Sequence, residues 1–125
     1  MSQILIVDDS AMVRRQVCNT LRTAGYEVCE AIDGQDALEK LTSDTWLVVC
    51  DVTMPRMDGL QFLETLRANP SFASLPVIML TTEGRPELIA KARALGTVGW
   101  LVKPFRPDLL IGALKALEGR RKVVT

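Results

Sequence analysis

The chain has 125 residues, 48% of them hydrophobic and 24% charged, and its 15 Lys and Arg balance its 15 Asp and Glu. This length suits one compact domain over residues 1–125, and a net charge of zero gives no general attraction to nucleic acid or to acidic membranes. The absence of histidine excludes Ser-His-Asp and Cys-His catalysis and nearly all zinc chemistry, while the lack of a membrane span or signal peptide predicts a cytoplasmic protein.

Five short apolar runs follow one another along the chain and predict five β-strands. They cover residues 4–7, 26–31, 46–50, 77–80 and 98–102. The first, third and fourth runs show no alternation of polar and apolar residues, which is typical of parallel strands covered on both faces.

Helices are expected after each of these runs, because apolar residues recur there every three or four positions. The positions that mark them are Val13, Val17, Leu21 and Ala24; Ala37, Leu38 and Leu41; Leu60, Leu63 and Leu66; Leu88, Ala92 and Leu95; and Leu110, Ala113, Leu114 and Leu117. Ser10 is suited to cap the first helix, and residues 119–125 are expected to form a frayed basic tail. The alternation predicts an α/β fold, with a doubly wound five-stranded parallel sheet and helices on both faces.

Polar residues follow four of the predicted strands at the point where each strand ends. They are Asp8 and Asp9, Asp51, Thr81 and Thr82, and Lys103. Because the carboxyl ends of parallel strands meet at one edge of a sheet, where ligands bind in such folds, we expect these side chains to lie close together. Each of these residues alone is more often a solvated turn or a structural group, so the functional interpretation depends on their joint placement.

Three carboxylates at one edge repel each other, and each close pair costs on the order of 1–4 kcal/mol. They are tolerated if they hold a hard cation, and Mg²⁺ prefers carboxylates, a carbonyl, waters and phosphate oxygens. Asp9 and Asp51 are the expected direct ligands, which leaves the other oxygen of Asp51 free to attack phosphorus. Lys103 then supplies a positive charge, and Thr81 a hydroxyl, for the phosphoryl oxygens.

Four segments spread over nearly the whole chain resemble one known family. They are residues 4–10 (ILIVDDS), 50–59 (CDVTMPRMDG), 76–81 (PVIMLT) and 99–105 (GWLVKPF). Together they resemble the receiver domains of bacterial two-component response regulators, and in particular the stand-alone domains of the CheY kind that act in chemotaxis.

The resemblance implies a flavodoxin-like strand order, 2-1-3-4-5, and a role for each residue at the strand ends. Asp51 is the implied site of phosphorylation. Asp8 and Asp9 are the implied acidic pair that places Mg²⁺, and the backbone carbonyl of Thr53 is a further implied ligand. Thr81 is the implied switch hydroxyl, and Trp100 is the implied switch aromatic. Lys103 is the implied lysine that contacts the phosphate, and the peptide bond that follows it is implied to be cis.

The resemblance also implies the partners of the chain and the form of its output. The phosphoryl donor is a sensor histidine kinase of the chemotaxis kind (CheA-like). The output is phosphorylation-dependent binding by a monomer to a motor switch or adaptor protein, with no nucleic acid or membrane involved. The chain is then no ordinary enzyme, since it catalyses only its own phosphorylation and dephosphorylation.

Three other functions are alternatives to this interpretation, and three residues depart from the usual pattern of the family. The function of a phosphorelay shuttle or phosphate sink stays open, and the intact acidic pair argues against a degenerate receiver that acts without phosphorylation. Phosphatases of the haloacid dehalogenase kind need a second Asp two residues after the nucleophile, where this chain has Thr53. The residues Thr53, Thr82 and Trp100 depart from the commonest pattern, and they bear on the dephosphorylation rate and on the movement of the aromatic.

Overall fold

The computed structural model describes residues 2–54, 56–82 and 84–124, with side chains as far as Gly119. Its elements alternate along the chain as expected. They are β1 (Gln3–Val7), α1 (Ala11–Thr23), β2 (Val28–Ala31), α2 (Gly34–Lys40), β3 (Thr45–Cys50), α3 (Gly59–Ala68), the short 3₁₀ helix η1 (Pro70–Phe72), β4 (Val77–Thr81), α4 (Pro86–Ala94), β5 (Gly99–Val102) and α5 (Pro107–Val124). Pro55, which belongs to one of the four segments quoted above, lies outside the described residues.

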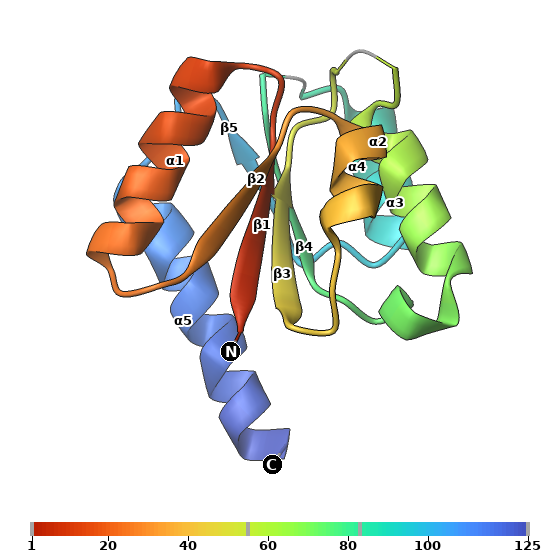
Figure 1. Ribbon diagram of the computed structural model, residues 1–125. Helices are drawn as coiled ribbons and strands as arrows, with labels where there is room; N and C mark the ends of the chain where they lie inside the picture. Colours follow the sequence, from red (N-terminus) through yellow and green to blue (C-terminus); the bar gives the residue numbers. More distant parts are fainter. Residues whose placement is uncertain (1, 55, 83, 125) are drawn as a thin grey trace.

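The five strands form one parallel sheet in the order β2-β1-β3-β4-β5, which confirms the predicted order. Strand β1 ends in register with β3, and β4 with β5, because Val7 pairs with Cys50 and Thr81 pairs with Val102. The carboxyl ends of all five strands therefore lie at one edge of the sheet, the upper edge in Figure 1.

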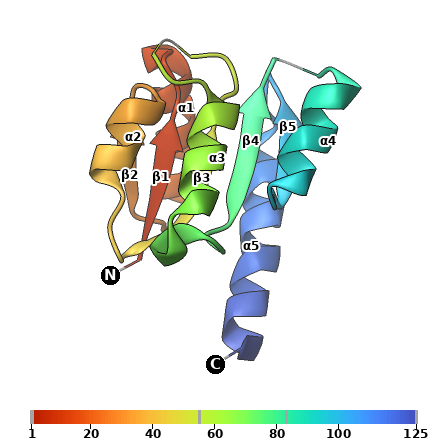
Figure 2. The ribbon, with the colours of Figure 1, turned by 90° about the vertical axis from the view of Figure 1, so that its right-hand side faces the viewer.

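Helices cover both faces of the sheet, as predicted. Figures 1 and 2 show α1 and α5 on one face, and α2, α3 and α4 on the other. Successive residues of a strand point to opposite faces, so Leu5 and Val7 pack toward α3 while Ile4 and Ile6 pack toward α1. Both faces of β1 are thus buried in a core, which explains the absence of polar alternation in its sequence.

The helix boundaries follow local capping contacts. The Ser10 hydroxyl accepts a hydrogen bond from the Val13 amide and begins α1, as predicted. Asp58 and Gln61 form a capping box at the start of α3. The capping box fixes the point where the loop after β3 ends and the helix begins.

The structure differs from the sequence prediction at three places. Strand β2 begins at Val28, because the Tyr26 amide still donates to the carbonyl of Leu21 in the turn after α1. The segment predicted as a frayed tail continues α5 to Val124. The helix η1 was not predicted, and it begins at Pro70, which is well suited to the first position of a helix.

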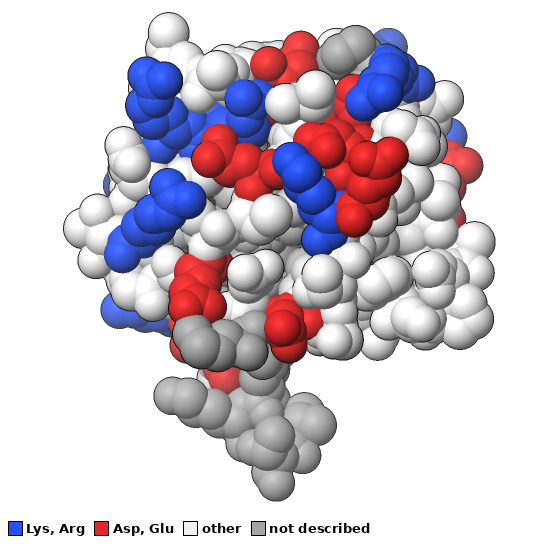
Figure 3. All heavy atoms as spheres, viewed as in Figure 1, with Lys and Arg blue, Asp and Glu red and all other residues white. Residues whose placement is uncertain are grey.

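Charges of both signs lie side by side where β2 meets α1 and α2 (Figure 3). Arg14 pairs with Glu30 at 3.3 Å, and Lys40 pairs with Asp36 at 3.1 Å. Within the described part of the chain, no helix is both long and apolar enough to cross a membrane.

Candidate functional site

Three carboxylates meet at the carboxyl edge of the sheet. Asp8 and Asp9 follow β1, and Asp51 follows β3, the adjacent strand. One oxygen from each lies within 4.8 Å of the others. Asp8 and Asp51 are buried while Asp9 is exposed, so the cluster opens to solvent on the side of Asp9.

The ammonium of Lys103 joins this cluster from the end of β5. Its Nζ lies 2.7 Å from Oδ2 of Asp8 and 3.1 Å from Oδ2 of Asp51. The Lys103 amide donates to the Thr81 carbonyl at 2.9 Å, which fixes the lysine backbone against the end of β4. The peptide bond between Lys103 and Pro104 is cis, as the resemblance implied.

The pKa values of Asp8 and Lys103 show how this cluster balances burial against charge. Burial raises the pKa of the Asp8 carboxyl, and the hydrogen bonds from Lys103 and from the Ser10 amide only partly offset it. Burial lowers the pKa of the Lys103 ammonium, but the hydrogen bond to Asp8 and the charges of Asp8 and Asp51 raise it by more. One ammonium contacts two of the three carboxylates in this cluster, and the site retains an excess of negative charge.

The carboxylate of Asp51 is held from two sides. Its Oδ1 accepts a hydrogen bond from the Val52 amide at 2.7 Å, while its Oδ2 faces Lys103. At Gly59, a Cβ atom would lie 2.1 Å from the Asp51 carbonyl oxygen, so the start of α3 can approach this strand end only with glycine. This close approach explains the glycine at the first position of α3.

The two predicted switch residues are placed differently from each other. Thr81 is fully buried at the end of β4, beside the strand that carries Asp51. The indole of Trp100 is half-buried against the core on the side of α3 and α4. Among the described residues, its Nε1 is a buried polar atom without a hydrogen-bond partner. The aromatic side chain therefore already packs inward in this structure.

Two hydrogen bonds to Asp8 were not predicted from the sequence. One comes from a guanidinium and the other from a backbone amide. The Asp8 backbone carbonyl accepts a hydrogen bond from the Arg14 guanidinium at 2.6 Å. Its Oδ1 accepts from the Ser10 amide at 2.9 Å. The helical spacing placed Arg14 on α1 but carried no information on which way its long side chain turns.

The donor set fits a hard divalent cation. Carboxylate oxygens are the ligands that Mg²⁺ prefers, and three of them converge here. Both oxygens of Asp8 already accept hydrogen bonds, from Lys103 and from Ser10. Both oxygens of Asp51 also accept hydrogen bonds, from Val52 and from Lys103, so hydrogen bonding does not separate these two carboxylates. Direct contact by Asp9 and Asp51 stays a prediction. Thr53 is exposed in the loop after β3.

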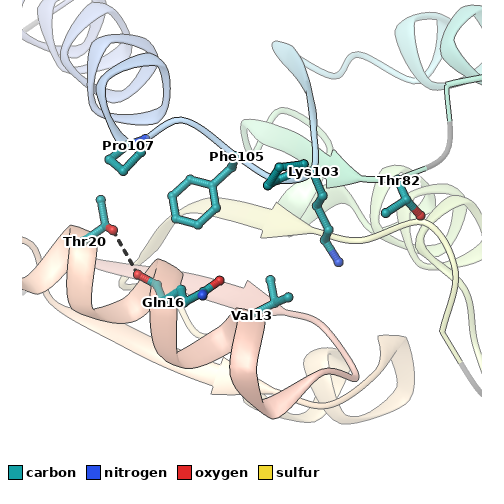
Figure 4. A pocket seen from close by; sticks show the side chains of 8 residues that line it. Val13, Gln16, Thr20, Thr82, Lys103, Phe105 and Pro107 are labelled. Atoms are coloured by element: carbon teal, nitrogen blue, oxygen red, sulfur yellow. Dashed lines mark hydrogen bonds between the residues drawn. The ribbon is translucent and has the colours of Figure 1, made fainter.

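A pocket of about 590 Å³ lies beside this cluster, between α1 and the segment that links β5 to α5. Figure 4 shows Phe105 and Pro107 facing Gln16 and Thr20 of α1, with Lys103 along the pocket wall. The pocket thus leads from an apolar surface to the lysine of the charged cluster.

Comparisons with known proteins cover nearly the whole chain. The model of the response regulator receiver domain matches residues 4–115. Chemotaxis protein CheY1 of Helicobacter pylori strain J99 is 41% identical over 120 residues, which are 94% of this chain and 97% of that protein. Protein PilG of Pseudomonas aeruginosa is 40% identical over 116 residues, which are 91% of this chain and 85% of that protein.

Solved structures agree with this similarity. The structure of chemotaxis protein CheY4 of Vibrio cholerae matches with a TM-score of 0.86 at 42% sequence identity. The match covers 93% of this chain and 98% of that one. Sequence and fold therefore point to the same group of proteins.

Proposed function

We propose, because this chain belongs to the response regulator receiver domain family, that Asp51 accepts a phosphoryl group and that the phosphorylated form binds a partner protein. Receiver domains are signalling domains of phosphorelays, and the relatives of this chain are chemotaxis proteins of the CheY kind. The observation that carries the proposal is the contact of one ammonium, that of Lys103, with both Asp8 and Asp51.

The proposed reaction moves a phosphoryl group from a phosphohistidine to Asp51. A carboxylate oxygen of Asp51 forms the new O–P bond as the P–N bond breaks, and the imidazole nitrogen keeps the electron pair and takes up a proton. Lys103 then pairs with a phosphoryl oxygen, and the Thr81 hydroxyl donates to another. Receiver domains bind Mg²⁺ at an acidic pocket; here Asp8, Asp9, Asp51 and the Thr53 carbonyl would hold the ion, which neutralises charge on the phosphoryl group when bound.

The proposed donor is a sensor histidine kinase, acting in the cytoplasm. The apolar pocket between α1 and the β5–α5 segment supports this assignment, because it adjoins Lys103 and offers Phe105 and Val13 to a docking protein. A partner seated there would present its phosphohistidine close to the carboxylate cluster. The test is phosphotransfer from an autophosphorylated chemotaxis kinase. Label that stays on the kinase when this chain and Mg²⁺ are added would contradict the assignment.

The proposed output is binding to a motor switch or adaptor protein through β5 and the helices beside it. Exposed apolar side chains support this location, since Val98, Val102 and Leu109 are each at least 44% exposed. The charge-balanced sequence favours a protein partner over nucleic acid. The amount of partner protein captured should therefore increase when the chain is phosphorylated. Equal capture by the phosphorylated and unphosphorylated chains would contradict the proposed switch.

Mg²⁺ is expected to stabilise the fold. The excess of carboxylates over ammonium groups gives the folded chain a site that the unfolded chain lacks. For a dissociation constant near 1 mM, 10 mM Mg²⁺ adds about 1.4 kcal/mol to the free energy of unfolding. Urea unfolding with and without the metal, at matched ionic strength, measures this difference. The variant Asp9→Asn is the control, and it should lose most of the gain. Identical curves for the wild-type chain would rule out the site.

A phosphate mimic is expected to change the fluorescence of Trp100, through Thr81, by altering the surroundings of an indole that already packs inward in this structure. Beryllofluoride with Mg²⁺ gives the Thr81 hydroxyl a charged acceptor worth roughly 1.5–3 kcal/mol, which shifts a two-state equilibrium about ten- to a hundredfold. Trp46 packs on Tyr26 at the amino-terminal end of the sheet, 6.2 Å between ring centroids, so Trp46→Phe leaves Trp100 as the reporter.

The controls separate the reporter from the coupling. In Trp46→Phe, the mimic should shift the emission of Trp100, and in the further variant Thr81→Ala that shift should disappear. If the emission of Trp100 is the same with and without the mimic, Trp100 does not report the switch. A full response without the Thr81 hydroxyl would assign the coupling to another group.

A further inference from the structure

The loop that follows β3 is tied to the start of α2 by an ion pair that the proposed function does not use. The Arg56 guanidinium donates from Nε to Oδ2 of Asp33 at 2.7 Å and from Nη2 to Oδ1 at 3.0 Å. The Asp33 side chain is only 2% exposed, although that of Arg56 is 60% exposed. This bidentate pair is called the Arg56–Asp33 clamp below.

Asp33 is a firm anchor for this clamp. Its Oδ1 also accepts a hydrogen bond from the Asp36 amide at 2.8 Å, so the same carboxylate caps α2. The hydrogen bonds from Arg56 and from the Asp36 amide lower the pKa of the Asp33 carboxyl, and the carboxylate stays charged at neutral pH. The guanidinium is therefore bound to a group that the first turn of α2 holds in place.

The backbone at Arg56 adopts a conformation that the clamp helps to maintain. Its φ angle is +64°, in the left-handed region that residues with a Cβ rarely occupy. Such a conformation persists only when the surroundings impose it. A second contact acts beside the clamp, since the Gly34 amide donates to the Met57 carbonyl at 3.1 Å. A Cβ at Gly34 would lie 2.7 Å from Cγ of Met57, so glycine is needed for the two segments to meet.

The other end of the loop is fixed at the proposed phosphorylation site. The Val52 amide donates to Oδ1 of Asp51, and the Val52 carbonyl accepts from the Gly59 amide at 2.7 Å. Thr53 lies between Val52 and Arg56, and its own side chain is exposed. Thr53 therefore lies in a segment that is held by contacts at Val52 on one side and at Arg56 on the other.

We propose that Arg56 is a positioning residue for the metal site, which it serves by holding the loop so that the Thr53 carbonyl is preorganised as a ligand. This inference rests on the proposed function, because it takes Asp51, Asp9 and the Thr53 carbonyl as the place where Mg²⁺ binds. A ligand that is fixed before the ion binds raises the affinity for Mg²⁺, because the loop is already ordered by folding and binding does not have to order it.

The test compares Arg56→Asn, Asp33→Asn and the double variant in Mg²⁺ binding and in unfolding without metal. Asparagine tolerates the left-handed conformation, so Arg56→Asn removes the guanidinium while allowing the same backbone. Asp33→Asn keeps an oxygen that can cap α2, and it provides a folded variant if Arg56→Asn unfolds. Lys91→Gln, which breaks the exposed pair of Lys91 with Glu64 between α4 and α3, is the matched control.

Each single variant is expected to raise the Mg²⁺ dissociation constant about tenfold, as loss of a partner behind a metal ligand does. The double variant should be no weaker than the single variants, because both changes remove one clamp. The control should bind Mg²⁺ as the wild-type chain does. Unchanged Mg²⁺ affinity in variants that are less stable without metal would make the clamp merely structural and overturn the inference. Failure of the wild-type chain itself to bind Mg²⁺ would instead overturn the proposed function, and the inference with it.

Discussion

Replacing Asp51 by Asn is expected to abolish phosphoryl uptake while making the metal-free chain more stable by about 1 kcal/mol. Uptake should fall to background because the amide is a poor nucleophile. Stability should rise because Asp51 adds a third negative charge to a site whose one ammonium already has a partner, Asp8, at 2.7 Å. Asparagine keeps the shape of the side chain, so the change mainly removes charge.

Urea unfolding in a chelator measures the stability, and incorporation of label from a small acyl phosphate measures the uptake. Glu27→Gln, on the exposed turn between α1 and β2, is the matched control and should change neither quantity. A clear loss of stability in Asp51→Asn without metal would show that Asp51 is stabilised by Lys103 more than it is repelled by its neighbours. Undiminished uptake would remove Asp51 from its proposed role.

Replacing Lys103 by Ala is expected to destabilise the metal-free chain by about 3 kcal/mol, since breaking a buried ion pair leaves its partner charge uncompensated. The side chains involved are well shielded, with Lys103 14% exposed and Asp8 4% exposed. Mg²⁺ should recover more stability in this variant than in the wild-type chain, because the ion then supplies the positive charge that the site has lost.

Lys103→Met separates charge from packing in this experiment, since it keeps most of the aliphatic stem. It should behave like Lys103→Ala in its response to Mg²⁺, with a smaller loss from packing. Phosphorylated Lys103→Met should also bind the partner protein more weakly than the phosphorylated wild-type chain. Equal stability of variant and wild type without metal would mean that the ammonium does not compensate the carboxylates.

The sequence predicted the elements and the strand-end cluster because both follow from short-range patterns. A buried parallel strand such as residues 46–50 is apolar throughout, and a polar residue directly after it must lie at the carboxyl edge of the sheet. Alternation of strands and helices does not by itself fix the strand order, and the order that the structure has came from the resemblance to receiver domains.

The contacts that the sequence did not predict join residues far apart in the chain through long side chains or unusual backbone. Arg56 reaches Asp33 across 23 positions, and it does so from a backbone with a left-handed φ angle. The inward position of Trp100 depends on how α4 packs, which no local pattern encodes. The extent of β2 likewise depended on the Tyr26 amide, which bonds back to the turn after α1.

The measurement that tests the central claim most directly is mass spectrometric mapping of the wild-type chain after reaction with a small acyl phosphate and Mg²⁺. Three carboxylates lie within 4.8 Å at the site, so identifying the one that is modified discriminates among Asp8, Asp9 and Asp51. The account predicts one phosphoryl group per chain, carried by Asp51, and no modification when Mg²⁺ is removed by a chelator. A phosphoryl group on Asp8 or Asp9, or uptake that is the same without the metal, would contradict it.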